Sequence, residues 1–149
     1  MSDDVFDDPA IIDVDVLYRK VPPAGDMVVY DDDGVTLLPT PAIFQWKKGE
    51  GVSVHLDSIL RLRGRDPRTL YDADCASLSF PVGAARSCGD GVARTLAVDD
   101  VDPDRVAAHA EIRRSADNDN RVHWGLTRKA ILKQCCWVVT PGKVGLLPG

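Results

Sequence analysis

Apolar and polar side chains alternate with a period of two between residues 11 and 19. This alternation predicts a β-strand with one buried face, which the Pro- and Gly-rich residues 22–25 end. Two further apolar runs, 27–30 and 35–38, flank the sequence Asp31-Asp32-Asp33-Gly34. A Gly after polar turn residues between two apolar runs is typical of a β-hairpin, so we expect one here.

The next part of the chain carries signals for helix ends. Ser53 is the expected N-cap of a helix over residues 53–63, and Gly64 is well placed to follow its last turn. Asp66 precedes a Pro, the combination that favours a helix start, so a short helix over 67–71 is expected next.

Strand patterns dominate the second half. Residues 77–82, 92–98 and 108–113 are predicted strands, and Pro81 favours an edge position for the first of them. The last predicted helix begins at Thr127 and reaches about residue 136. Helices and strands are mixed without regular β-α-β alternation. The sequence therefore predicts an α+β fold, a single compact domain with a mixed or antiparallel sheet and two to four helices.

Charge is distributed unevenly along the chain. Residues 1–33 hold ten Asp against Arg19 and Lys20, a net charge of −8, whereas residues 34–149 hold sixteen Lys and Arg against thirteen Asp and Glu, a net charge of +3. This division suggests three regions: an acidic N-terminal segment that is a candidate for mobility (1–10), a globular α+β domain (11–140) and an irregular tail (141–149).

The densest basic run consists of Arg61, Arg63, Arg65 and Arg68, here called the Arg run. Guanidinium groups bind carboxylate or phosphate in a bidentate manner, so the Arg run is the candidate binding surface. The alternative is a solvated helix end whose cations are stabilised by the helix dipole. Opposite charge also suggests that the acidic N-terminal segment docks on the Arg run, in the same chain or in a neighbouring copy.

Composition and charge limit the cellular location, the class of partner and the source that we expect for the protein. No stretch approaches eighteen apolar residues, so no membrane span is expected, and Met1 to Asp4 do not resemble a signal peptide. The four Cys form no C-x-x-C pair and predict reduced thiols in the cytoplasm. Nucleic acid is a disfavoured partner because the chain has a net charge of −5. Two Glu against twenty-one Asp, and twelve Arg against six Lys, suggest GC-rich codons and hence a bacterial or phage origin.

No metal site is predicted. Residues 31–34 and 117–120 do not fit the EF-hand template, and His55, His109 and His123 are too scattered for a zinc site. A further possibility is a thiolate nucleophile, Cys75 or Cys88, paired in space with His55 or His109. The alternative is that these thiols are small core residues.

The tripeptide Leu17-Tyr18-Arg19 leaves an early predicted strand. It resembles the opening strand of Arg-Ser-Glu type ADP-ribosyltransferases, in which the Arg holds the phosphates of NAD. The resemblance implies that Arg19 binds phosphate, that Ser53 is the strand Ser, and that Glu111 is the catalytic carboxylate. The chain departs from the family pattern, since it has no Ser-Thr-Ser triplet and no Glu-x-Glu.

Two functions follow from these patterns. The first is a small bacterial or phage binding or accessory protein, or a subunit of a larger assembly, that uses the Arg run to bind a protein partner or a second copy and needs no cofactor. The alternative is an enzyme acting on a nucleotide or phosphorylated substrate, most concretely an ADP-ribosyltransferase or NAD-cleaving domain. In that case NAD is the cofactor, Arg19 binds phosphate and Glu111 stabilises the developing oxocarbenium charge.

Overall fold

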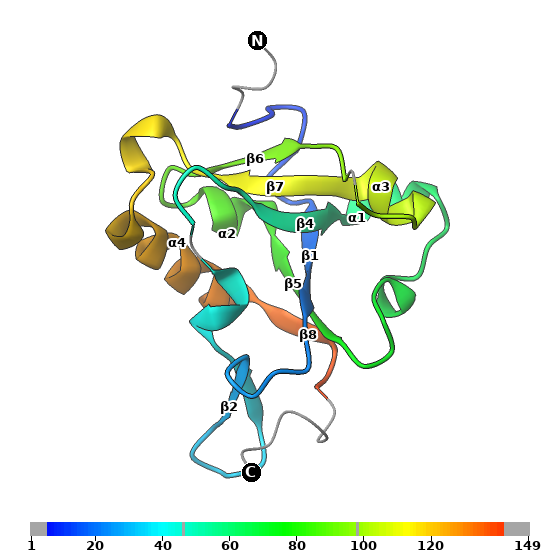
Figure 1. Cartoon of the computed structure of the whole chain (residues 1–149), viewed down its shortest axis with the longest axis vertical. Helices are drawn as coiled ribbons and strands as arrows, with labels where there is room; N and C mark the ends of the chain where they lie inside the picture. The colour runs from blue at the N-terminus through cyan, green and yellow to red at the C-terminus, as the bar shows by residue number, and fades with distance from the viewer. Residues whose placement is uncertain (1–5, 46, 98, 142–149) are drawn as a thin grey trace.

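A six-stranded antiparallel sheet organises the fold in the computed structural model, which describes residues 6–45, 47–97 and 99–141. The strand order is β6-β7-β4-β1-β5-β8. The strands are β1 (Val16–Val21), β4 (Val52–Leu56), β5 (Ala76–Pro81), β6 (Gly91–Arg94), β7 (His109–Arg113) and β8 (Cys136–Val139). In Figure 1, β6, β7 and β4 run together across the molecule, and β1, β5 and β8 turn away from them.

One face of this sheet carries the main hydrophobic core. Leu17, Val54 and Phe80, from three different strands, are buried in the same cluster. Helices α2 (Val82–Arg86) and α4 (Arg121–Gln134) pack against each other, and α4 adds the fully buried Trp124 and Ile131 to this cluster. Burying a large apolar side chain stabilises a fold by roughly 1.5–3 kcal/mol, so this face dominates the stability of the domain.

The opposite face has a smaller apolar cluster. Tyr18 packs there with Leu60, Leu70 and Ala108. These residues come from β1, from helices α1 (Asp57–Leu62) and α3 (Pro103–Ala108), and from the residue after the 3-10 helix η3 (Pro67–Thr69). Figure 1 shows α1 and α3 together at one end of the sheet, so they cover only part of this face.

A second, two-stranded sheet is formed by β2 (Val28–Tyr30) and β3 (Leu37–Pro39), which confirms the predicted hairpin. Its turn contains Gly34 at a positive φ of 69°, a conformation that favours Gly. The indole nitrogen of Trp137 donates a hydrogen bond to the Leu37 carbonyl at 3.0 Å and ties the hairpin to β8. Two more 3-10 helices, η2 (Pro41–Phe44) and η4 (Ala116–Asn118), complete the described elements.

The α+β prediction is confirmed: the described residues form one compact domain with an antiparallel sheet and four α-helices. The predicted helix from Ser53 is wrong in its first half. Val52, Val54 and Leu56 alternate as buried positions of β4, and the helix begins only at Asp57. The period-two burial of this segment therefore prevails over the capping signal of Ser53.

Other boundaries also differ from the predicted ones. Helix α4 begins at Arg121, capped by the side chain of Asn120, and Thr127 is a buried residue inside it. Strand β5 lies between β1 and β8 rather than at an edge; Pro81 is accommodated because it is the last residue of the strand. The predicted acidic segment and tail lie partly outside the described residues, at 1–5 and 142–149.

Within the part of the chain that the structure describes, no helix is long and apolar enough to cross a membrane.

Candidate functional site

A cavity of about 510 Å³, here called the sheet pocket, lies against β4 and β7. Two cross-strand pairs, two rungs apart on these strands, contribute to its lining: Ser53 opposite Glu111, and His55 opposite His109. Directly opposed residues share a face of an antiparallel sheet, and so do residues two apart on one strand. The four polar side chains therefore lie on one face, while their neighbours Val54 and Ala110 are fully buried.

Arg19 of β1 also lines the sheet pocket. The ladder between β1 and β4 includes only residues 17 and 18 of β1, so Arg19 is the first residue beyond it. Its guanidinium donates hydrogen bonds to the Ile43 carbonyl at 2.9 and 3.1 Å and to the Ser53 carbonyl at 2.8 Å. Burial lowers the pKa of this guanidinium from its ordinary value, but an Arg side chain stays charged in proteins.

His55 lies deep in the sheet pocket, with 7% of its surface exposed. Its Nδ1 is 2.7 Å from the hydroxyl of Tyr71, and that hydroxyl donates to the Tyr18 carbonyl at 3.2 Å. The Tyr71 hydroxyl therefore engages Nδ1 of His55 in either tautomer of the ring. Burial, with a smaller contribution from His109, lowers the pKa of His55 to about 4, so His55 is neutral near pH 7.

His109 is more exposed than His55 and packs edge-on against it, with ring centroids 5.6 Å apart. Its Nδ1 is 2.8 Å from the side-chain oxygen of Thr95 and 3.3 Å from the Thr95 carbonyl oxygen. The Thr95 backbone nitrogen in turn donates to the His109 carbonyl at 3.3 Å. Thr95, just beyond β6, therefore fixes the orientation of the His109 ring.

Glu111 is partly buried, and its Oε1 accepts a hydrogen bond from Nε of Arg113 at 3.1 Å. The carboxylate lies over Gly51: a Cβ added to Gly51 would be 2.8 Å from the Glu111 Cβ and 2.9 Å from its Oε1. Only Gly allows so close an approach, so the backbone before β4 is shaped around this carboxylate.

Arg105 of α3 holds the loop on the far side of the sheet pocket. Its guanidinium donates two hydrogen bonds of 2.8 Å to the Asp100 carboxylate and one of 2.6 Å to the Leu70 carbonyl. The Arg105 hydrogen bonds are the main cause that lowers the pKa of Asp100 to about 2. This pair stabilises the wall formed by the loop after β6.

The residues that the family resemblance assigned, Arg19, Ser53 and Glu111, thus line one cavity. Sequence reasoning missed Tyr71, Thr95 and Arg105. A usable signal was present for the histidines, since the polar residues of Ser53-Val54-His55 and His109-Ala110-Glu111 alternate with apolar ones. No comparable pattern marks the three missed residues, which lie outside the strands.

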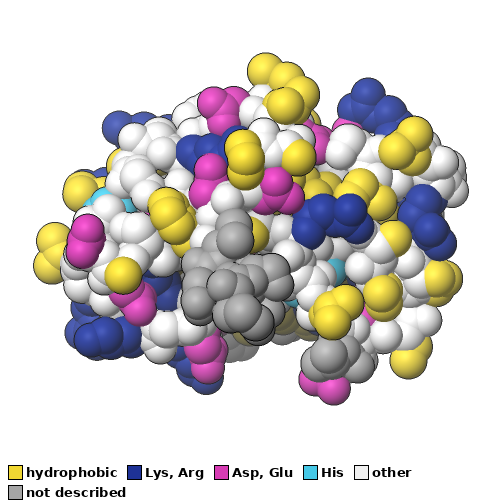
Figure 2. Space-filling model, turned by 90° about the horizontal axis from the view of Figure 1, so that it is seen from above, with side chains coloured by type: hydrophobic (Ala, Val, Ile, Leu, Met, Phe, Trp, Pro, Cys, Tyr) yellow, Lys and Arg dark blue, Asp and Glu magenta, His cyan; other side chains and the backbone are white. Residues whose placement is uncertain are grey.

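The Arg run lies at α1 and η3, away from the sheet pocket, and each of its side chains contacts a carboxylate. Arg65 donates to Asp102 at 2.9 and 3.1 Å and to Asp104 at 2.9 Å. The other pairs are Arg61–Asp57, Arg63–Asp104 and Arg68–Asp66. Figure 2 shows acidic and basic side chains next to each other on the face it presents, as such pairing produces. The binding role of the Arg run stays a prediction.

The described residues 6–10 of the acidic segment, and the residues that follow them, contact Arg86 of α2 rather than the Arg run. The Arg86 guanidinium donates to Asp7 and Asp13, each at 2.8 Å. It also bonds the carbonyls of Asp8 at 2.8 Å and Ile11 at 2.6 Å. Opposite charge does attract this segment, but to a single Arg that forms part of the fold.

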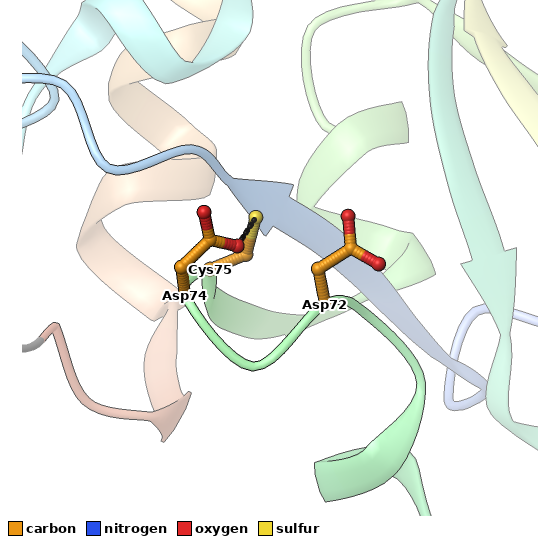
Figure 3. A group of neighbouring side chains, drawn as sticks. All are labelled: Asp72, Asp74 and Cys75. Atoms are coloured by element: carbon orange, nitrogen blue, oxygen red, sulfur yellow. Dashed lines mark hydrogen bonds between the residues drawn. The ribbon is translucent and has the colours of Figure 1, made fainter.

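One group in the described residues has spacing compatible with a metal ion: Asp72, Asp74 and Cys75 (Figure 3), whose ligand atoms lie within 4.8 Å of one another. The Cys75 thiol donates to Asp74 at 3.6 Å, and burial is the first cause that raises the pKa of this thiol. The thiol is therefore held in its protonated form, and both carboxylates are exposed. We assign no metal to this group. Neither Cys75 nor Cys88 lines the sheet pocket that holds His55 and His109.

A second polar cluster is buried between α4 and the turn before β6. Thr127 donates to the Asp90 carboxylate at 2.5 Å, and Nε2 of His123 is 3.4 Å from the other oxygen. Burial raises the pKa of Asp90. None of these residues lines the sheet pocket.

The chain matches no protein-family model, no curated protein and no solved structure.

Proposed function

We propose that the protein is an enzyme that acts on a nucleotide or another phosphorylated substrate in the sheet pocket, most concretely by cleaving NAD or transferring its ADP-ribosyl group. One observation carries the proposal. Arg19, Ser53 and Glu111 come from three strands and from distant parts of the chain, yet all three line the same cavity beside two histidines. A volume of about 510 Å³ is in the range of small-molecule sites, roughly 300–1,000 Å³.

The positive charge of Arg19 supports an anionic ligand. Its three hydrogen bonds go to neutral carbonyl groups, and no carboxylate among the described residues pairs with it. A guanidinium has five N–H donors, so two are left for another acceptor. A partly buried charge without a counter-ion is costly, and a phosphate oxygen bound there would reduce that cost.

The Glu111 carboxylate supports the chemical step. Breaking the bond between a ribose and a pyridinium leaving group develops positive charge on the sugar. A preorganised negative charge beside the sugar stabilises that transition state more than the ground state. Glu111 is suited to this role because Arg113 and the backbone at Gly51 hold it in place.

Nicotinamide release from NAD and calorimetric binding of ADP-ribose test the proposal. We expect Glu111→Gln to lose at least about 100-fold in turnover, the cost typical of removing one electrostatic stabiliser. Its melting temperature and ADP-ribose affinity should stay close to wild type. Glu50→Gln is the matched control, because Glu50 is the other Glu of the chain, is exposed and does not line the sheet pocket. A wild-type protein that neither binds ADP-ribose nor releases nicotinamide overturns the proposal.

The prediction of a binding or accessory protein stays open beside this proposal, as do bacterial origin and a cytoplasmic location. The binding function is tested by comparing the partners that co-purify with wild type and with the double variant Arg61→Glu/Arg65→Glu. Arg65 contacts Asp104 of α3 and its N-cap residue Asp102, so thermal unfolding must accompany that test. Retention of every partner by the double variant would exclude the Arg run as the binding surface.

A further inference from the structure

Resting on the function proposed above, we propose that His109 is the base that takes a proton from an attacking water molecule, so that the substrate is hydrolysed and its ADP-ribosyl group is not transferred to another protein. The proposal names a second catalytic residue and the acceptor of the reaction. It rests on the hydrogen bonds, exposure and neighbours of the two pocket histidines.

The tautomer of His109 follows from its contacts with Thr95. A carbonyl oxygen only accepts hydrogen bonds, so the tautomer that satisfies both Thr95 contacts carries its proton on Nδ1. The same proton also points to the Thr95 side-chain oxygen at 2.8 Å. Neutral His109 therefore has its lone pair on Nε2, and no hydrogen bond to that atom is found among the described residues.

His55 is excluded as the base by its burial. Its Nε2 is inaccessible to solvent and has no hydrogen-bond partner among the described residues, and its Nδ1 is engaged by Tyr71. Its role is to pack against His109 while remaining neutral. A neutral neighbour does not repel the proton that His109 takes up in the proposed step.

The charged side chains that line the sheet pocket with His109 are also compatible with its role as a base. Glu111 lies two residues along β7 on the same face, and Asp99 and Asp100 line the facing wall. The positive groups of the sheet pocket are Arg19, Lys20 and Arg105, and Arg105 is paired with Asp100. These carboxylates line the same cavity as the ring that takes the proton.

The reaction balances without a further reactant. The water oxygen forms a bond to the anomeric carbon of the ribose as the bond from that carbon to the pyridinium nitrogen breaks. The bonding electrons go to the ring nitrogen, and nicotinamide leaves as a neutral molecule. The water proton passes to Nε2 of His109 and then to solvent. No electrons are gained or lost overall, and the products are ADP-ribose, nicotinamide and a proton.

Water is the acceptor that fits the location of the base. His109 lies on the strand face inside the sheet pocket, so a nucleophile that it activates must enter the cavity together with the substrate. Water is small enough to reach Nε2 of His109 beside a bound substrate, and it is the acceptor that we propose.

The test measures NAD cleavage and ADP-ribose binding for His109→Ala. General-base catalysis typically contributes 10²- to 10⁴-fold, so we expect turnover to fall by about 100-fold or more while ADP-ribose affinity changes by less than about twofold. Added imidazole should restore part of the activity of His109→Ala and leave wild type and Glu111→Gln unaffected. The molar amount of free ADP-ribose formed should equal the molar amount of nicotinamide released.

A second pair of variants tests the positioning of the ring. Thr95→Val removes the hydroxyl beside Nδ1, and we expect kcat to fall with KM unchanged, whereas Thr95→Ser should restore kcat. An active wild type with a fully active His109→Ala overturns the inference and leaves the proposed function standing. ADP-ribose found attached to protein, or a His109→Ala variant that loses ADP-ribose binding, also overturns it. A wild type without binding or cleavage overturns the proposed function, and this inference with it.

Discussion

Ser53 and Glu111 oppose each other across the β4–β7 ladder, two rungs from the pair His55 and His109. This register brings two short polar patterns, more than fifty residues apart in the sequence, onto one face of the sheet. A slip of one residue in either strand would turn its polar side chains into the hydrophobic core. The core residues on the opposite face therefore hold the candidate site in register.

The close approach of Gly51 to Glu111 gives a direct test of the site. In Gly51→Ala, the new Cβ would meet Glu111 at 2.8 Å, so the carboxylate must move. We expect the free energy of unfolding to fall by about 1–3 kcal/mol, as overpacking usually costs. NAD cleavage should fall with it, measured as nicotinamide release beside urea denaturation.

Gly125→Ala is the matched control for that variant. Gly125 lies inside α4, and a Cβ there meets nothing within 4 Å. Ala is favoured over Gly in a helix, so this variant should stabilise the protein by about 1 kcal/mol and leave cleavage unchanged. Equal stability of the two variants would contradict the described packing at Gly51.

The stability of the protein should depend on the protonation of His55. Its pKa is lowered to about 4 in the folded state, against 6.5 for the free side chain, so the unfolded chain binds more protons between these values. The contribution of His55 to the free energy of unfolding is fully present above pH 6.5 and is lost as the pH falls towards 4. At about 1.4 kcal/mol per pH unit, the loss is about 3 kcal/mol.

Denaturation curves of wild type and His55→Gln between pH 7 and pH 4 measure this contribution. For each protein, the free energy of unfolding is plotted against pH. The difference between the slopes of the two plots isolates the contribution of His55 from that of the carboxylates, which titrate in both proteins. Parallel slopes would mean that His55 is not buried in its neutral form.

Arg86 should stabilise the N-terminal segment. Its guanidinium bonds two carboxylates and two carbonyls between residues 7 and 13, and hydrogen bonds to charged groups contribute more than neutral ones. Arg86→Met should lower the free energy of unfolding by about 2 kcal/mol and expose this segment to limited proteolysis. Lys133→Met, which removes an exposed charge, should do neither. An unchanged cleavage pattern in Arg86→Met would contradict this role.

Much of the fold could be predicted from local patterns. The hairpin around Gly34, the Asp66 cap and the strand at 108–113 follow from turn chemistry, capping and alternation, which act within a few residues. The predictions failed where two local signals competed. Ser53 is a good capping residue in a segment whose apolar positions alternate, and burial of those positions in the sheet stabilises the strand.

The sequence by itself determined the α+β class, the hairpin and the strand that becomes β7, because these depend on periodicity and residue type. Only the tertiary structure decided that Arg19, Ser53, His55, His109 and Glu111 line one cavity, and that the Arg run is paired with Asp residues. The physical reason is that strand order and register arise from long-range packing of the core. No pattern within a short stretch of sequence encodes which strands become neighbours.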